Sequence, residues 1–264
     1  MNGLDFGFGH LEAEFWRLVF AMTRIGAALV AAPLFGAAGV SAQARVIVAG
    51  AIAVLVCAWT PLAAPVQLLS LAGLMATLQE VLIGLVLGFV LQLSFAAPTI
   101  AAEIIGGGMG MNMAASIDPQ SGTQSPALGH FFAVVLTVVF LGLNAHLGWI
   151  ALILRSYETF PPNPQGLGHW FGPDRIHALL GFGTTMFATA IAIALPVTLI
   201  LLLVQVATAV IGRSAPSLNL FSLGLPAGVL AGLAALIAAA PLIADRSSEL
   251  SLTAIDQAAT LIGR

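Results

Sequence analysis

Four ionisable residues lie inside the long apolar runs of this sequence: Arg17, Arg24, Glu80 and Glu103. Because a charge is costly in apolar surroundings, such a residue pairs with an opposite charge, contacts another subunit or faces a polar conduit. Arg17 and Arg24 are seven residues apart, so they lie two turns apart on one helix face. Each is suited to pair with a carboxylate elsewhere in the chain or in a neighbouring subunit.

Glu80 is followed by two glycines at helical spacing, Gly84 and Gly88. Small residues four positions apart let two helix backbones approach closely, a pattern common in membrane helices. We therefore predict that Glu80, Gly84 and Gly88 form an assembly contact, or that Glu80 lines a conduit. The alternative is that Glu80 ends a membrane span and extends its carboxylate to water.

The sequence contains no recognisable catalytic or metal-binding arrangement. Four histidines, His130, His146, His169 and His177, lack the i, i+4 pairing and the acidic companion of a zinc hydrolase helix. No Gly-x-Ser-x-Gly elbow, P-loop or dinucleotide fingerprint occurs. We therefore predict no catalytic residue, no metal site and no cofactor.

A glycine- and methionine-rich segment, residues 106–122, lies between two apolar runs. Glycine lowers helix stability by about 1 kcal/mol per residue relative to alanine, so we expect the backbone to leave the helix before or within this segment. Methionine side chains are unbranched and soft, so they can close an irregular opening and still move aside. We predict a plug or gating loop formed by Gly106, Gly107, Gly108, Met109, Gly110, Met111, Met113, Asp118 and Pro119. The alternative is a loop that only connects two helices.

Composition assigns the chain to a membrane. Hydrophobic residues make up 59% of its 264 residues and charged residues only 7%, against roughly 25% charged residues in soluble domains. The basic residues are all arginines and the formal net charge is only -3, so the chain has no basic stripe for nucleic acid. The first apolar run lacks the basic start of an export signal, so we expect it to remain in the protein.

Stretches of about 20 apolar residues suggest six membrane spans. The third and fifth exceed one bilayer thickness and contain Pro98 and Pro196, so they are predicted to be either bent hairpins or long tilted helices. The polar tail, residues 245–264, has the spacing of a short amphipathic helix, and we expect it to lie outside the bilayer or against a partner. The six predicted spans are 15–38, 46–64, 68–102, 131–154, 177–211 and 218–244.

The predicted fold is an all-α, multi-helix integral membrane protein. Prolines and glycines at residues 161–174 interrupt the helices. We therefore divide the chain into an N-terminal helical part, residues 1–174, and a C-terminal helical hairpin with a polar tail, residues 175–264.

Several motifs together resemble one known family. They are Gln79-Glu80 with Gly84-x-x-x-Gly88-Phe89, Gly108-Met-Gly-Met-x-Met, Ile117-Asp-Pro-Gln-Ser-Gly122, Leu141-Gly-Leu-Asn-Ala-His146, and Gly212-Arg-x-Ala-Pro-x-Leu-Asn-x-Phe221 with Gly224-Leu-Pro226. This pattern resembles the FliR family, the R-type export-gate subunits of the bacterial flagellar type III secretion apparatus.

The resemblance implies a single R-type chain that assembles with P-type and Q-type membrane proteins into a closed helical gate, with a B-type switch protein docked at its base. It implies unfolded flagellar proteins as substrates and a place in the inner membrane, in the flagellar basal body. It also implies a P-like part followed by a Q-like hairpin, and a plug at residues 106–122. The loop that contains Arg213, Pro216 and Asn219 then serves either subunit contact or the cytoplasm-facing entrance. Because helices in such an assembly pack on other subunits, hydropathy spans need not cross a flat membrane.

Two other classes of function are possible for an apolar chain of this kind. A small-solute secondary transporter is suggested by intramembrane charge and by proline-containing long runs, but it requires a midplane site with inverted repeats, and neither is visible in the sequence. An intramembrane enzyme requires a catalytic constellation that the sequence does not contain.

Overall fold

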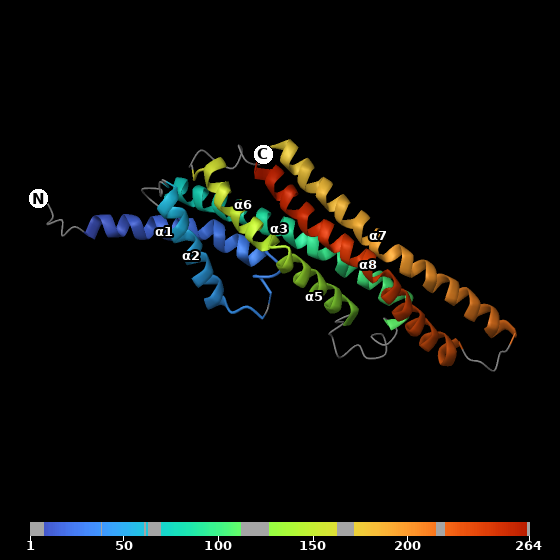
Figure 1. The fold of residues 1–264 in the computed structure, drawn as a ribbon. Helices are drawn as coiled ribbons and strands as arrows, with labels where there is room; N and C mark the ends of the chain where they lie inside the picture. The colour runs from blue at the N-terminus through green and yellow to red at the C-terminus, as the bar shows by residue number, and fades with distance from the viewer. Residues whose placement is uncertain are drawn as a thin grey trace, which may run out of the picture. The chain divides into compact units, whose positions relative to one another are not determined.

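The computed structural model describes residues 8–37, 39–60, 62, 70–111, 127–162, 172–214 and 220–262. Within these ranges the chain is helical and contains no strand, which confirms the predicted all-α class. The helices are α1 (Phe8–Ala31), α2 (Ala42–Trp59), α3 (Leu71–Gly108), α5 (Ala127–Gly142), α6 (Ala145–Thr159), α7 (Pro173–Ser214) and α8 (Leu220–Ile262), shown in Figure 1.

The helices form two compact units. The first unit comprises Met1–Leu93, Ala145–Phe182 and Ala254–Arg264, and the second comprises Ser94–Asn144 and Gly183–Thr253. The long helices α3, α7 and α8 each contribute residues to both units.

The structure corrects the predicted number of spans. Among the described residues, four helices are long and apolar enough to cross a membrane, or five if α5 and α6 together make one span. The predicted span 15–38 is not among them: most of this stretch belongs to α1, which carries charged side chains.

The third and fifth predicted spans belong to single helices of 38 and 42 residues that contain Pro98 and Pro196, so the hairpin alternative is wrong.

The predicted span 131–154 is not one continuous helix, because α5 ends at Gly142 and α6 begins at Ala145; the two helices together make at most one broken span. Asn144 has φ 55°, a left-handed conformation that asparagine adopts more readily than most residues with a side chain. Its amide still bonds the carbonyl of Leu141, at 3.0 Å. Hydropathy does not detect such a break, since Asn144 is one polar residue in an apolar run.

The first unit is built on the buried face of α1 and on α6. Phe20, Ile25 and Leu29 of α1 are at most 2% exposed. From α6, the Trp149 indole N–H donates to the backbone carbonyl of Leu87 on α3, at 3.1 Å, and its ring stacks on Phe35, 5.8 Å between centroids. This one side chain therefore joins α6 to α3 and to the segment that follows α1.

An arginine holds the connection between α1 and α2. Arg45 donates from Nε to the carbonyl of Phe35, at 2.9 Å, and from Nη2 to the carbonyls of Ala37 and Val40, at 3.0 and 2.9 Å. One guanidinium thus supplies donors to three backbone carbonyls of this connection, and the carbonyl of Ala37 also accepts from the Val40 amide, at 3.0 Å.

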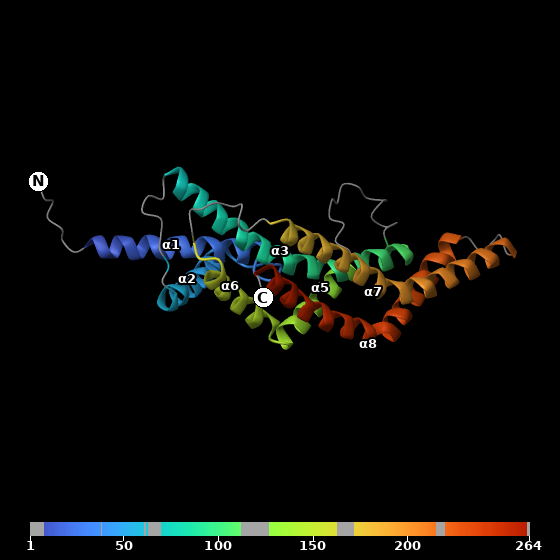
Figure 2. The same cartoon turned by 90° about the horizontal axis from the view of Figure 1, so that it is seen from above.

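In the second unit, α5 packs on α3 through an edge-to-face contact of Phe140 with Phe95, 5.7 Å between ring centroids. The end of α7 and the start of α8 lie side by side in both views (Figures 1 and 2).

The helix α8 continues without a break to Ile262. Residues 245–262 of the tail are therefore helical, as predicted, but they are the last turns of α8 and not a short helix.

Candidate functional site

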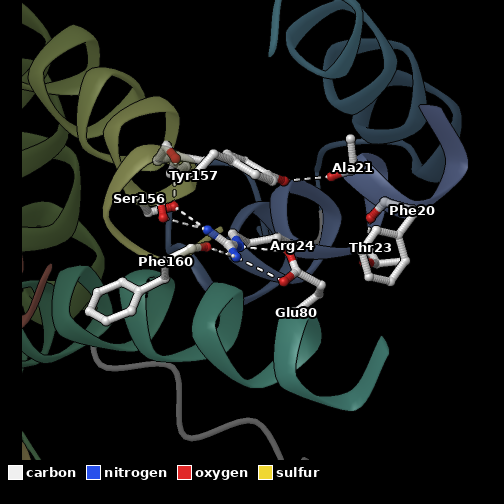
Figure 3. A network of polar contacts seen from close by, with 9 residues as sticks. Phe20, Ala21, Thr23, Arg24, Glu80, Ser156, Tyr157 and Phe160 are labelled. Atoms are coloured by element: carbon white, nitrogen blue, oxygen red, sulfur yellow. Dashed lines mark hydrogen bonds and ion pairs between the residues drawn. The ribbon is translucent and has the colours of Figure 1, made fainter. Parts of the chain in front are cut away.

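Arg24 of α1 and Glu80 of α3 form a buried ion pair (Figure 3). Arg24 donates from Nε and from Nη2 to the two carboxylate oxygens of Glu80, both at 2.8 Å. The two side chains are 0% and 1% exposed. Two parallel bonds of this kind hold the planar guanidinium in one orientation. The sequence identified both residues as ionisable groups in apolar runs, and the structure brings them together.

The remaining donors of Arg24 face α6 and the residue that follows its last turn. Nη1 donates to the carbonyl and the hydroxyl of Ser156, at 2.7 and 3.0 Å, and Nη2 donates to the carbonyl of Phe160, at 2.8 Å. The guanidinium lies 4.1 Å from the centre of the Tyr157 ring, whose hydroxyl donates to the carbonyl of Ala21. All five N–H donors of the guanidinium thus have acceptors, and one side chain joins α1, α3 and α6.

Gly84 and Gly88 allow α3 to approach α1 closely enough for this ion pair. A Cβ atom at Gly84 would overlap the carbonyl oxygen of Arg24, and one at Gly88 would lie 2.5 Å from the carbonyl oxygen of Ala28. Any larger residue would separate the two backbones. The structure therefore places Glu80, Gly84 and Gly88 at a helix contact within this chain, and their role in contacts with other subunits stays a prediction.

Arg17, two turns before Arg24, has different partners. Its Nη2 donates to the carbonyls of Cys57 and Thr60, at 2.6 and 2.9 Å, where α2 ends. Its Nη1 lies 3.4 Å from the exposed carboxylate of Glu14. The positive charge stands against the carbonyl end of a helix, where the helix dipole is negative. Arg17 therefore fixes α2 on α1.

The glycine-rich segment begins as helix and then turns. The helix α3 continues through Gly106 and Gly107 to Gly108, and the amide of Gly110 bonds the carbonyl of Gly107, at 3.0 Å. Gly110 has φ 78°, a backbone conformation that residues with a side chain rarely adopt. The helix thus ends within the segment, as its glycine content predicts.

Met109 is the buried residue of this turn, at 2% exposure. Met109 occupies a notch on α8 formed by Gly228 and Gly232: its backbone faces Gly228, and its side chain faces Gly232, where a Cβ atom would lie 2.5 Å from Cγ of Met109. From α7, Gln205 donates its Nε2 to the carbonyl of Gly108, at 2.8 Å. Two helices of the second unit therefore hold the end of α3.

The other predicted site residues are placed as follows. Met111 is 39% exposed, and Arg213 is exposed at the end of α7. Met113, Asp118, Pro119 and the rest of the segment to Gly122 lie outside the described residues, as do Pro216 and Asn219. The described residues contain no group of three histidine, cysteine or acidic side chains that could hold a metal ion.

Sequence reasoning missed five contributing residues. Gly228 and Gly232 repeat the spacing of Gly84 and Gly88, so the same small-residue pattern could have found them. Ser156, Tyr157 and Gln205 carry no such signal, because their contacts connect residues about 100 or more positions apart and partly use backbone carbonyls.

Comparison with known proteins adds a second line of evidence. The family model for bacterial export proteins, family 1, matches residues 15–253. The flagellar biosynthetic protein FliR of Escherichia coli (strain K12) is 31% identical over 89% of this chain and 86% of the relative. FliR of Bacillus subtilis (strain 168) is 33% identical over 77% of this chain and 78% of the relative.

A shorter match comes from the surface presentation of antigens protein SpaR of Shigella flexneri, 33% identical over 56% of this chain and 55% of its own length. None of these names supports a small-solute transporter. The apolar helices show a membrane-embedded protein. The matched range contains the buried ion pair, the glycine-rich end of α3 and its notch on α8, and the chain is therefore a member of the bacterial export proteins, family 1, to which the FliR proteins belong.

Proposed function

We propose that this chain is a non-enzymatic subunit of a flagellar type III protein export gate in the bacterial inner membrane, at the flagellar basal body. It assembles with P-type and Q-type subunits and with a B-type switch protein. The assembled conduit passes unfolded flagellar proteins, and the energy for transport comes from other members of the machine. The glycine-rich end of α3 contributes to the seal that closes this conduit at rest.

The observation that carries the proposal is the construction of the α3 end. A conduit wide enough for an unfolded chain would also pass ions, so it needs a seal that can move. Gly106–Gly108 and Gly110 give the backbone freedom, and Gly110 already adopts a left-handed conformation. Met109 closes against α8 with a soft, unbranched side chain. A loop that only joined two helices would need neither feature.

The apolar surface of the described helices supports assembly. Large side chains on three helices are strongly exposed: Ile47 of α2 at 70%, Val138 of α5 at 64% and Leu203 of α7 at 70%. In a membrane protein such surfaces meet lipid or the helices of other subunits. A chain that forms one part of a larger helical gate needs apolar surface that contacts lipid and apolar surface that contacts the other subunits.

Deleting Gly106–Gly110 tests the proposed seal. In the assembled complex at rest, the deletion is expected to raise ion conductance of the membrane, because the turn that carries Met109 is removed. The yield of the complex serves as the control for assembly. Unchanged conductance in a complex of normal yield would contradict the proposed function.

A further inference from the structure

We propose that the α7–α8 hairpin latches the end of α3, and that release of Met109 from its notch on α8 is the step that frees the segment. The latch consists of Met109, Gly228 and Gly232, with the hydrogen bond from Gln205 to Gly108. This inference rests on the proposed function, because it names what holds the same seal closed.

The first part of the latch is steric. Gly228 and Gly232 are one helical turn apart on α8, so their missing side chains leave one continuous notch. Met109 fills it: an ideal Cβ at Gly228 would lie 3.3 Å from the Met109 carbonyl oxygen, and one at Gly232 would lie 2.5, 2.7 and 2.8 Å from Cγ, Cε and Sδ. Only a residue without a side chain at position 232 admits Met109 in this position.

The second part is a single hydrogen bond. The carbonyl of Gly108 lies at the end of α3, where helix carbonyls lack an intrahelical partner. Gln205 of α7 supplies the missing donor, at 2.8 Å and at an exposed position. A single bond between neutral groups contributes only modestly to stability. The bond therefore orients the turn but does not lock it.

Both contacts come from the C-terminal hairpin, one from each of its helices. A displacement of α8 by the width of one side chain removes the notch, because the notch exists only where Gly228 and Gly232 face Met109. Methionine leaves a cleft readily, because it is unbranched and has three rotatable bonds. A movement of the hairpin is thereby converted into release of the Gly108–Gly110 turn.

The first test is Gly232→Ala in the co-expressed complex. The added methyl group displaces Met109 while the rest of α8 keeps its helix, and the resting ion leak is expected to rise about tenfold, the factor that corresponds to about 1.4 kcal/mol of lost closed-state preference. Gly183→Ala on α7 is the matched control, because a Cβ there meets nothing within 4 Å. Gln205→Leu is expected to raise the leak less than Gly232→Ala. A leak equal to that of the Gly183→Ala control would overturn the latch.

The second test is a reversible crosslink: Met109→Cys with Gly232→Cys, in a Cys57→Ser background so that this chain carries no other thiol. The sulfur introduced at position 109 takes the place of the methionine Cγ, which lies 2.5 Å from the Cβ position of residue 232. Mild oxidation is expected to form the bond in the resting complex and to stop export, and a reductant is expected to restore it. No bond at rest, or export at the wild-type rate with the bond formed, would overturn the latch.

The two proposals fail in different ways. If the Gly106–Gly110 deletion leaks but the crosslink does not form, the latch is wrong and the seal stands. If the deletion does not leak and the crosslink forms without stopping export, the seal itself is wrong, and the latch with it. Should the Gly232→Ala complex not assemble, the crosslink alone decides.

Discussion

Arg24 donates to both carboxylate oxygens of Glu80 at 2.8 Å, in a site where neither side chain is more than 1% exposed. Each charge alone would be costly to bury, but the bidentate pair is neutral and every donor of the guanidinium is bonded. The helix α1 is too charged to count as a span by its own composition. Arg17 and Arg24 can pack against the other helices because α2, α3 and α6 supply acceptors for their N–H groups.

Glu80→Ala is expected to destabilise the first unit by about 3 to 5 kcal/mol, since it leaves Arg24 buried without a counter-charge. Assembly of the complex and motility should fall accordingly. Glu103→Ala, an exposed carboxylate on the same helix, is the matched control and should change little. Thermal unfolding of the purified chain measures the difference, and normal motility with normal complex yield for Glu80→Ala would show that the pair is dispensable.

The double substitution Arg24→Met with Glu80→Leu should restore much of the stability lost in either single variant. Replacing both members of a buried ion pair by apolar residues removes the unpaired charge that each single change leaves. A double-mutant cycle on unfolding midpoints gives the coupling directly. Additive losses would mean that Ser156 and Phe160 matter more to Arg24 than Glu80 does.

Gly88→Leu is expected to separate α3 from α1, because its Cβ alone would lie 2.5 Å from the carbonyl oxygen of Ala28. Overpacking of this kind costs about 1 to 3 kcal/mol or more. Gly26→Ala in α1, where a Cβ meets nothing within 4 Å, is the control and should be neutral or slightly stabilising. Equal stability of the two variants would contradict the close contact of α1 with α3.

Asn144→Val should destabilise the break between α5 and α6 by about 1 to 2 kcal/mol, because a branched residue is strained at φ 55°. Asn144→Gly should be tolerated. Comparing the unfolding midpoints of the two variants measures this strain. A valine variant as stable as the glycine variant would mean that the left-handed turn is absent.

His146→Ala should leave export largely intact, provided the protein folds, because no catalytic or proton-transfer role is proposed for this residue. The measurement is secretion of a flagellar substrate against complex yield. Loss of export from an intact complex would instead point to a proton-coupled step at His146.

The sequence allowed prediction of the membrane class, the helical fold and the end of α3, because each depends on local composition. Gly110 illustrates this: clustered glycines weaken a helix whatever surrounds it. Pro98 and Pro196 do not decide from the sequence whether their apolar runs form hairpins or single long helices. A proline removes one backbone hydrogen bond, but in apolar surroundings the rest of the helix is the only way to satisfy the remaining backbone groups, so α3 and α7 continue through them.

Partners across the chain could not be predicted. Arg24 and Glu80 were each identified as buried-charge candidates, yet their pairing depends on the register of α1 against α3, 56 residues apart. Met109 was expected to close an opening, but Gly228 and Gly232 become its notch only once α8 packs beside the end of α3. These contacts follow from tertiary packing, which periodicity within one helix does not encode.

The central claim, that this chain is a subunit of an export gate, is tested most directly by the mass of what it assembles into. The affinity-tagged chain is co-expressed with the P-type and Q-type proteins of the same organism, and the purified material is weighed by native mass spectrometry. We predict a discrete large complex with few copies of this chain. Recovery of only a free monomer or homodimer would contradict the account.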